Sequence, residues 1–171
     1  MRDLMIDIET LGTGINSVIT QIGACYFDRY TGTIGETFIV NIRIQDCLDK
    51  GLEVDGGAIK FWFEQSHQDF LQAPIDLEKA LGQFKNFCKK DINVWAHSTF
   101  DFPIIGNAYR VIKQGLPYHY RSTRDIRTLV DLSGIAYKKY VRGGVHHNAL
   151  DDCKFQVKYC SDCFKTLKGN K

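Results

Sequence analysis

The chain has 171 residues, of which 44% are hydrophobic, 25% are charged and 12% are aromatic. This length fits one ordinary domain, and the composition excludes disordered, collagenous and fibrous proteins. The sequence contains no apolar run of roughly 18 residues that could span a bilayer, and no repeat with a period of about 20 to 50 residues. We therefore expect a single domain over residues 1–171 with no membrane association.

The N-terminus and the cysteines indicate a cytoplasmic protein. Asp3 and Asp7 interrupt the segment where a secretory signal needs an unbroken apolar stretch. A chain of this length does not need disulfides to hold its core, so we expect the six cysteines to be reduced thiols. Cys160 and Cys163 form one Cys-x-x-Cys pair, but a structural zinc site needs four ligands and no second pair matches it.

Positive charge is concentrated in one stretch of the chain. The formal net charge is +2, but residues 110–142 carry eight Lys or Arg against two Asp, which gives +6 there and −4 elsewhere. This asymmetry is typical of a protein with one face for a polyanion, and equally of a solvated surface. The charge count alone leaves both interpretations open.

The first predicted elements are three antiparallel strands. Leu4–Ile8 has the pattern of a short strand that ends in a Gly-bearing loop. Residues 18–27 and 36–42 are rich in β-formers, and the turn residues at 28–32 between them predict a hairpin.

Helices and short strands alternate after this point. In chain order, the pattern predicts helices over residues 58–65 and 77–89, a strand over 93–96, a helix over 101–114, a strand over 121–125, a short helix to about 132, and a long helix over 148–168. Strands followed by alternating helices and strands predict an α/β fold, with a mixed five-stranded sheet flanked by helices.

Asp7 and Glu9 are the first candidates for chemistry. They lie two residues apart at the end of a predicted strand, so both carboxylates face the same side. Two such charges repel each other, and a divalent cation would reverse the sign of that energy. Asp76 and Glu78 repeat the spacing at a predicted helix, where two residues turn through about 200° and the side chains diverge.

Two further acids lie at helix starts. Asp101 follows a strand that leads directly into a helix, which is also the place of a capping acid. Asp152 lies in the first turn of the last helix, which Asn148 is expected to cap together with Asp151. His147 precedes that helix and can share a site with Asp152 only from a flexible loop, since a continuous helix would separate them by about 140°. A mobile histidine beside carboxylates suits a general base.

Together these residues resemble the DEDD-type 3′-5′ exonucleases of the histidine-bearing (DEDDh) subclass, which include RNase T, oligoribonuclease and proofreading subunits. Residues 7–10 match the family's first motif, Phe100-Asp101 the second, and His147-x-Ala149-x-x-Asp152 the third; the resemblance covers nearly the whole chain.

Residues 59–66 and 124–129 look further like the RNase T-like branch of bacteria and phages. Ser98 departs from the pattern, since many relatives carry Asn there, which leaves the hydrogen bonding of the second motif open. His146 and Asp151 have the same spacing as the third-motif pair, and only Ala149 decides the register in favour of His147 and Asp152.

The resemblance implies an RNase H-like fold and a metal-dependent 3′-5′ exonuclease. Its substrate would be single-stranded RNA or DNA, or short oligonucleotides, and its product nucleoside 5′-monophosphates. The implied ligands of two Mg²⁺ or Mn²⁺ ions are Asp7, Glu9, Asp101 and Asp152. His147 is implied to be the general base. Several relatives are homodimers, so a homodimer is a further possibility.

Substrate contacts follow from the same resemblance. Thr10 and Leu11 are implied to hold the terminal nucleotide, and Trp62 is the candidate aromatic that packs on its base. Trp62 shares a helical face with Ile59 and Phe63, so a place in the core is the other interpretation. Basic residues that could hold upstream phosphates are Arg110, Arg124, Arg127, Lys138, Lys139 and Arg142.

Two other functions stay open on the sequence alone. The chain could be a nucleic-acid-binding module without turnover, although the complete acid set argues against it. It could also be an RNase H-like endonuclease. The choice between RNA and DNA depends on loop contacts that the sequence does not reveal.

Overall fold

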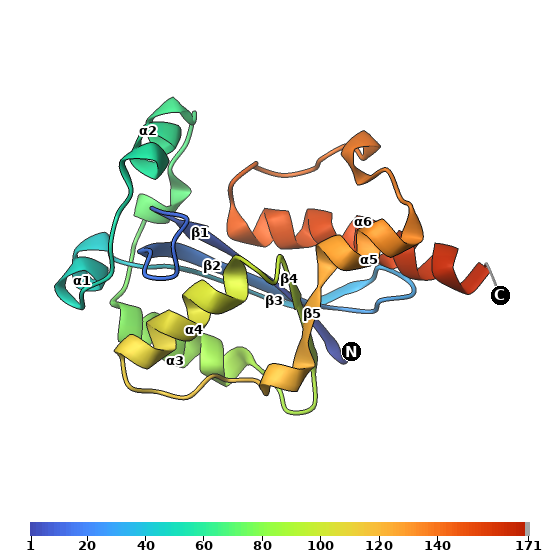
Figure 1. Ribbon diagram of the computed structural model, residues 1–171, viewed down its shortest axis with the longest axis horizontal. Helices are drawn as coiled ribbons and strands as arrows, with labels where there is room; N and C mark the ends of the chain where they lie inside the picture. The colour runs from blue at the N-terminus through green and yellow to red at the C-terminus, as the bar shows by residue number, and fades with distance from the viewer. Residues whose placement is uncertain (170–171) are drawn as a thin grey trace.

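The computed structural model describes residues 1–169; Asn170 and Lys171, the last residues of the predicted domain, lie outside the described part. A five-stranded sheet has the order β3-β2-β1-β4-β5 (Figure 1). Its strands are β1 (Asp3–Thr10), β2 (Ile19–Phe27), β3 (Ile34–Asn41), β4 (Asn93–Ala96) and β5 (Thr123–Asp125). The first three are antiparallel, while β4 pairs parallel to β1 and β5 parallel to β4. The predicted mixed sheet is confirmed.

Helices cover both faces of this sheet. In chain order they are α1 (Ile44–Asp49), α2 (Gly56–Glu64), α3 (Leu77–Phe87), α4 (Asp101–Val111), α5 (Ile126–Ser133) and α6 (Ala149–Gly169). Single 3₁₀ turns occupy Asp69–Leu71, Tyr120–Ser122 and Tyr137–Lys139. Helices α5 and α6 lie on one face, α3 and α4 on the other, and α1 and α2 at one end (Figure 1). Within residues 1–169, no helix is long and apolar enough to cross a bilayer.

The central strand β1 is buried along its whole length. Leu4, Ile6 and Ile8 pack into the core beneath α3 and α4, whereas Met5 packs against α5 and α6. Because side chains alternate along a strand, Asp7 and Glu9 point to the same face as Met5, toward α6. The sheet thus presents both carboxylates to the longest helix.

Some element boundaries differ from the predictions. β1 continues past Ile8, because Glu9 and Thr10 still pair with β2, across an irregularity in register. Helix α1 lies between the predicted strand 36–42 and the predicted helix 58–65, where the pattern predicts no element, since six residues are too few to show a helical period. Helix α4 ends at Val111, three residues early, because Lys113 adopts a left-handed backbone conformation with φ +56°.

The start of α6 rests directly on β2. Gly23 pairs with Asp7 across the β1–β2 ladder, and a Cβ on Gly23 would lie 2.3 Å from the carbonyl carbon of Ala149. The Ala149 amide also donates to Gln21 Oε1 at 2.7 Å. Only glycine permits this approach, and the approach fixes the first turn of α6, which carries Asp152, beside Asp7.

We expect Gly23→Ala to displace that first turn. The added methyl group meets backbone atoms, which cannot rotate away, so the variant should lose about 1–3 kcal/mol of unfolding free energy. Gly82→Ala is the matched control, because its Cβ in α3 meets nothing within 4 Å; it should be neutral or stabilising by roughly 0.5–1 kcal/mol. Thermal unfolding measures both, and equal melting temperatures for Gly23→Ala and wild type would contradict the close contact.

Candidate active site

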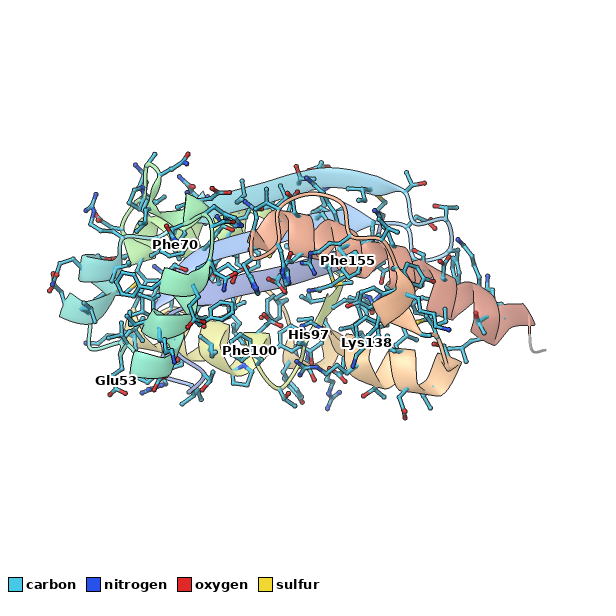
Figure 2. The ribbon with its side chains drawn as sticks, turned by 90° about the horizontal axis from the view of Figure 1, so that it is seen from above. Glu53, Phe70, His97, Phe100, Lys138 and Phe155 are labelled. Atoms are coloured by element: carbon cyan, nitrogen blue, oxygen red, sulfur yellow. The ribbon has the colours of Figure 1, made fainter. Side chains whose placement is uncertain are left out.

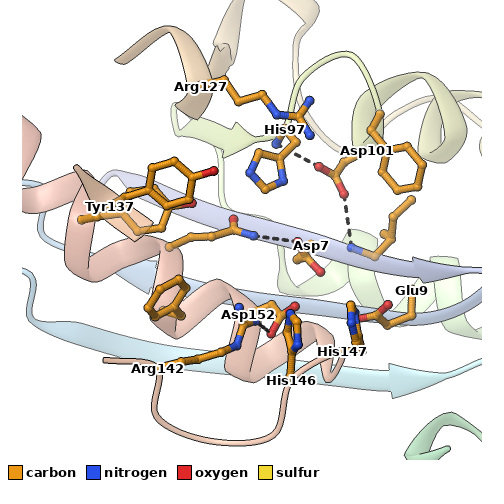
Figure 3. Close-up of a pocket in the computed structure, with 15 residues that line it drawn as sticks. Asp7, Glu9, His97, Asp101, Arg127, Tyr137, Arg142, His146, His147 and Asp152 are labelled. Atoms are coloured by element: carbon orange, nitrogen blue, oxygen red, sulfur yellow. Dashed lines mark hydrogen bonds and ion pairs between the residues drawn. The ribbon is translucent and has the colours of Figure 1, made fainter. Parts of the chain in front are cut away.

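A cavity of about 420 Å³ opens between α6 and the carboxyl ends of β1 and β4 (Figure 3). Seen from the α5–α6 side, His97, Phe100 and Phe155 lie around it near the middle of the molecule (Figure 2). All five residues predicted to be catalytic line this cavity: Asp7, Glu9, Asp101, His147 and Asp152.

The four carboxylates form two overlapping groups. Ligand atoms of Asp7, Glu9 and Asp152 lie within 4.8 Å of one another, and so do those of Asp7, Asp101 and His97. Asp7 belongs to both groups. Residues from β1, α4 and α6, which are distant in sequence, therefore converge on one carboxylate.

Hydrogen bonds hold these acids in place. The Asp101 carboxylate accepts from the backbone amides of His97 at 2.9 Å and Ile8 at 3.3 Å, which ties the loop after β4 to β1. Gln156, one turn after Asp152 on α6, donates to Asp7 Oδ1 at 2.7 Å. The carboxylates therefore have fixed directions before any ligand arrives, which is a condition for precise coordination.

This arrangement is unfavourable without a cation. Asp7, Glu9 and Asp101 are only 8%, 7% and 1% exposed. Burial raises the pKa of all three carboxyls, and neighbouring carboxylates raise the pKa of Glu9 and Asp101 further. Hard oxygen donors at this density match the preference of Mg²⁺ and Mn²⁺, which would offset the repulsion. The donor set fits the predicted cofactor.

His147 lies in the loop before α6, as its predicted role requires. Its φ of +60° is unusual for a residue with a side chain, and such strain is concentrated at functional sites. Its ring stacks on His146 with centroids 3.8 Å apart and meets Phe61 edge-on at 4.8 Å. Burial, with the charges of His146 and Arg142, lowers the pKa of His147 to about 4, so the imidazole is neutral at physiological pH.

The two possible registers of the third motif have different surroundings. Asp152 lines the cavity, together with both His146 and His147. Asp151 instead accepts a hydrogen bond from the Val145 amide at 2.9 Å and pairs with Lys154. The Asn148 side chain accepts from the Asp151 amide at 3.2 Å, as the expected cap requires. Asp152, and not Asp151, is therefore the acid of this pair that lines the cavity.

A second cavity of about 470 Å³ adjoins the first across His147 and Glu9. Thr10, Phe61 and Trp62 line it, and the Trp62 indole donates to the Thr10 carbonyl at 2.9 Å. Trp62 also belongs to the core, as one of its two interpretations expects. Leu11 is buried in the core and lines a separate hollow instead.

Sequence reasoning missed several residues that line the first cavity: His97, Tyr137, Phe155, Gln156 and Tyr159. One pattern could have revealed some of them. Asp152, Gln156 and Tyr159 recur at the spacing of a single helical face, and the apolar residues that interleave with them pack on the sheet.

Solved structures share this fold. Exonuclease X in complex with 5′-overhanging duplex DNA superposes with a TM-score of 0.65 at 16% identity, covering 97% of this chain and 93% of that one. E. coli exonuclease I in complex with a dA16 oligonucleotide gives a TM-score of 0.68 at 14% identity, over 98% of this chain and 43% of that one. The chain thus spans less than half of exonuclease I. These likenesses define an RNase H-like fold of the exonuclease type.

A family model gives the narrower assignment. The 3′-5′ exoribonuclease Rv2179c-like domain matches residues 2–164. The protein therefore belongs to this family and is a hydrolase of the 3′-5′ exonuclease class. No curated protein matches the sequence.

The buried acids lead to a prediction about stability without metal. Because burial raises the pKa of Glu9 above its ordinary value of 4.5, the stability contributed by its protonated form is present below that pH and is lost as the pH rises. Glu9→Gln carries no charge to bury. In chelator at pH 8 it should therefore unfold about 2–8 °C above wild type, and the difference should close toward pH 4.

Differential scanning calorimetry across this pH range measures the effect. Glu64→Gln, at an exposed position at the end of α2, is the matched control and should show no such difference. Manganese should raise the melting temperature of wild type more than that of Glu9→Gln. A Glu9→Gln protein that melts at or below wild type at pH 8 would show that the carboxylate is not under electrostatic strain.

Proposed function

We propose that the protein is a metal-dependent exonuclease of the DEDDh subclass that removes nucleotides from the 3′ end of single-stranded RNA. One observation carries this proposal: four carboxylates from three distant segments converge in one cavity, with a neutral histidine at its edge. The family description supports RNA as the substrate.

The two overlapping carboxylate groups support a pair of ions. Asp7, Glu9 and Asp152 would hold one, Asp7 and Asp101 the other, and Asp7 would be the shared ligand. When bound, two Mg²⁺ or Mn²⁺ ions polarise the attacking water and stabilise the leaving 3′ oxygen. His97, whose nitrogen lies with Asp7 and Asp101, is an additional candidate ligand.

His147 supplies the base in this proposal. Its imidazole lines both cavities, so it lies where the terminal nucleotide meets the carboxylates. The neutral ring can accept the proton of a water that attacks the phosphorus. Stacking on His146 and the edge contact with Phe61 hold the ring on a loop that would otherwise leave it free to turn.

The second cavity suits the terminal nucleotide. Phe61, Trp62 and Phe100 give it an aromatic lining on which any base can pack, and Thr10 adds a hydroxyl next to Glu9. Leu11 supports this cavity only from the core side. The upstream strand would then leave through the first cavity, toward Arg127 and Arg142.

The proposal also includes membership of the RNase T-like branch and a homodimer. Residues 59–66 overlap the second half of helix α2, whose Phe61 and Trp62 line the second cavity, which supports a place in the RNase T-like branch. A homodimer is carried over from the relatives, and sedimentation of the purified protein would test it.

Digestion of RNA tests the activity. With Mg²⁺ or Mn²⁺, a 5′-labelled single-stranded RNA should shorten from its 3′ end and release nucleoside 5′-monophosphates. His147→Ala should lower kcat by roughly 10²–10⁴, because the base is lost, and should leave the melting temperature close to wild type. The control is His119→Ala, an exposed histidine that does not line either cavity. Full-length RNA after incubation with wild type and metal would end the proposal.

The sugar preference needs a separate comparison. Matched RNA and DNA strands of the same sequence should give a higher kcat/KM for RNA. The structural neighbours are bound to DNA in their complexes, so a preference for DNA is the result that would overturn the assignment to RNA. A circular RNA included in the same experiment should stay intact, since internal cleavage would indicate an endonuclease.

A further inference from the structure

Arg142 is the one basic residue that forms an ion pair with a carboxylate of the candidate site, within residues 1–169. Its guanidinium contacts Asp152 (Figure 3). The guanidinium carbon also lies 4.8 Å from the centroid of the Phe155 ring. The sequence placed Arg142 only among six candidates for phosphate contact. The structure brings it into the carboxylate cluster itself.

The pairing has an electrostatic reason. Asp152 lies with Asp7 and Glu9, so three negative groups share a small volume and a positive group beside them relieves the repulsion. Arg142 is also partly desolvated, and its Nε is buried without a partner among the described residues. The guanidinium thus has donor capacity that Asp152 does not use.

A divalent ion and this guanidinium cannot use Asp152 in the same way. Both are cations that need the same carboxylate, and they repel each other at contact distance. An ion that binds Asp7, Glu9 and Asp152 would repel the Arg142 guanidinium and weaken its pairing with Asp152. Arginine keeps its charge at any physiological pH, so the displaced guanidinium needs another anion.

The chain around Arg142 permits this change. Residues 140–148 contain neither helix nor strand, and Gly143 and Gly144 follow Arg142 directly. The segment is anchored on both sides, by the Tyr140 hydroxyl to Asp162 at 2.8 Å and by the Val145 amide to Asp151 at 2.9 Å. The Arg142 side chain can therefore move between these anchors without breaking either.

The position of Phe155 indicates which anion Arg142 would reach. Of the two cavities, Phe155, Tyr137 and Tyr159 line only the first, Phe61 and Trp62 line only the second, and Phe100 lines both. Arg142 lines the first cavity together with Phe155 and does not line the second cavity, which is proposed to hold the terminal nucleotide. On the proposed path of the substrate, the anion in the first cavity would be the phosphate of the upstream strand, and a guanidinium fork matches two phosphate oxygens.

We propose that Arg142 is a counter-ion of Asp152 in the metal-free site and a ligand of the upstream phosphate in the substrate complex. The phosphate role rests on the proposed nuclease function, whereas the counter-ion role does not. Arg142 thereby couples the loading of metal to the recognition of a nucleic acid longer than one nucleotide.

Calorimetry with Mn²⁺ alone tests the counter-ion role. Removal of a competing cation should make Arg142→Ala bind Mn²⁺ about 5- to 20-fold more tightly than wild type, with Arg142→Lys between them. Lys154→Ala is the matched control, because Lys154 pairs with Asp151, the neighbouring acid on the same helical turn. Its affinity should stay within about twofold of wild type. Unchanged or weaker Mn²⁺ binding in a folded Arg142→Ala protein would overturn the counter-ion role.

Two substrates test the phosphate role. A five-nucleotide RNA has upstream phosphates, whereas the p-nitrophenyl ester of uridine 5′-monophosphate has none. At saturating Mn²⁺, Arg142→Ala should raise the KM for RNA about tenfold more than the KM for the ester, and Arg142→Lys should recover part of the loss. Equal effects on both substrates, or no effect on RNA, would overturn this role. If wild type hydrolyses neither substrate, the proposed function fails and the Mn²⁺ titration still decides the counter-ion role.

Discussion

The candidate site depends on the enforced proximity of like charges. Three carboxylates that are almost fully buried lie around the end of β1, together with Asp152, which is slightly more exposed. A protein interior does not gather such groups for stability, since each one is costly to bury ionised. The surrounding structure holds the carboxylates together against their mutual repulsion. It does so through a fully buried central strand, backbone amides that donate to Asp101, and a glutamine that donates to Asp7. The ability of these carboxylates to bind a divalent cation together accounts for the energetic cost of burying them.

Much of this arrangement is visible in the sequence, because it is encoded by local periodicity. The alternation of side chains along β1 puts Asp7 and Glu9 on one face, and the capping pattern after Asn148 sets the start of α6 and the direction of Asp152. The order of strands and helices was predictable for the same reason. Element boundaries were less predictable. Helix α1 is too short to show a period, and α4 ends near Lys113, whose left-handed backbone conformation is not expected from a lysine in the sequence.

Contacts between distant segments could not be predicted in this way. His97 joins the carboxylates because β4 pairs with β1, and Arg142 reaches Asp152 because its loop returns over α6. Trp62 had two interpretations from sequence, as core or as substrate contact; its side chain packs in the core and also lines the second cavity, which the spacing alone did not indicate. Such juxtapositions depend on tertiary packing, which periodicity does not contain.

The close contact between β2 and the start of α6 shows that a residue without a reactive group can determine the geometry of a site. Gly23 offers no donor, acceptor or charge, yet the absence of its side chain determines where an acid more than a hundred residues away comes to rest. Surveys that look for reactive groups alone would pass over it. In this protein a residue without a side chain therefore helps to position the carboxylates of the candidate site.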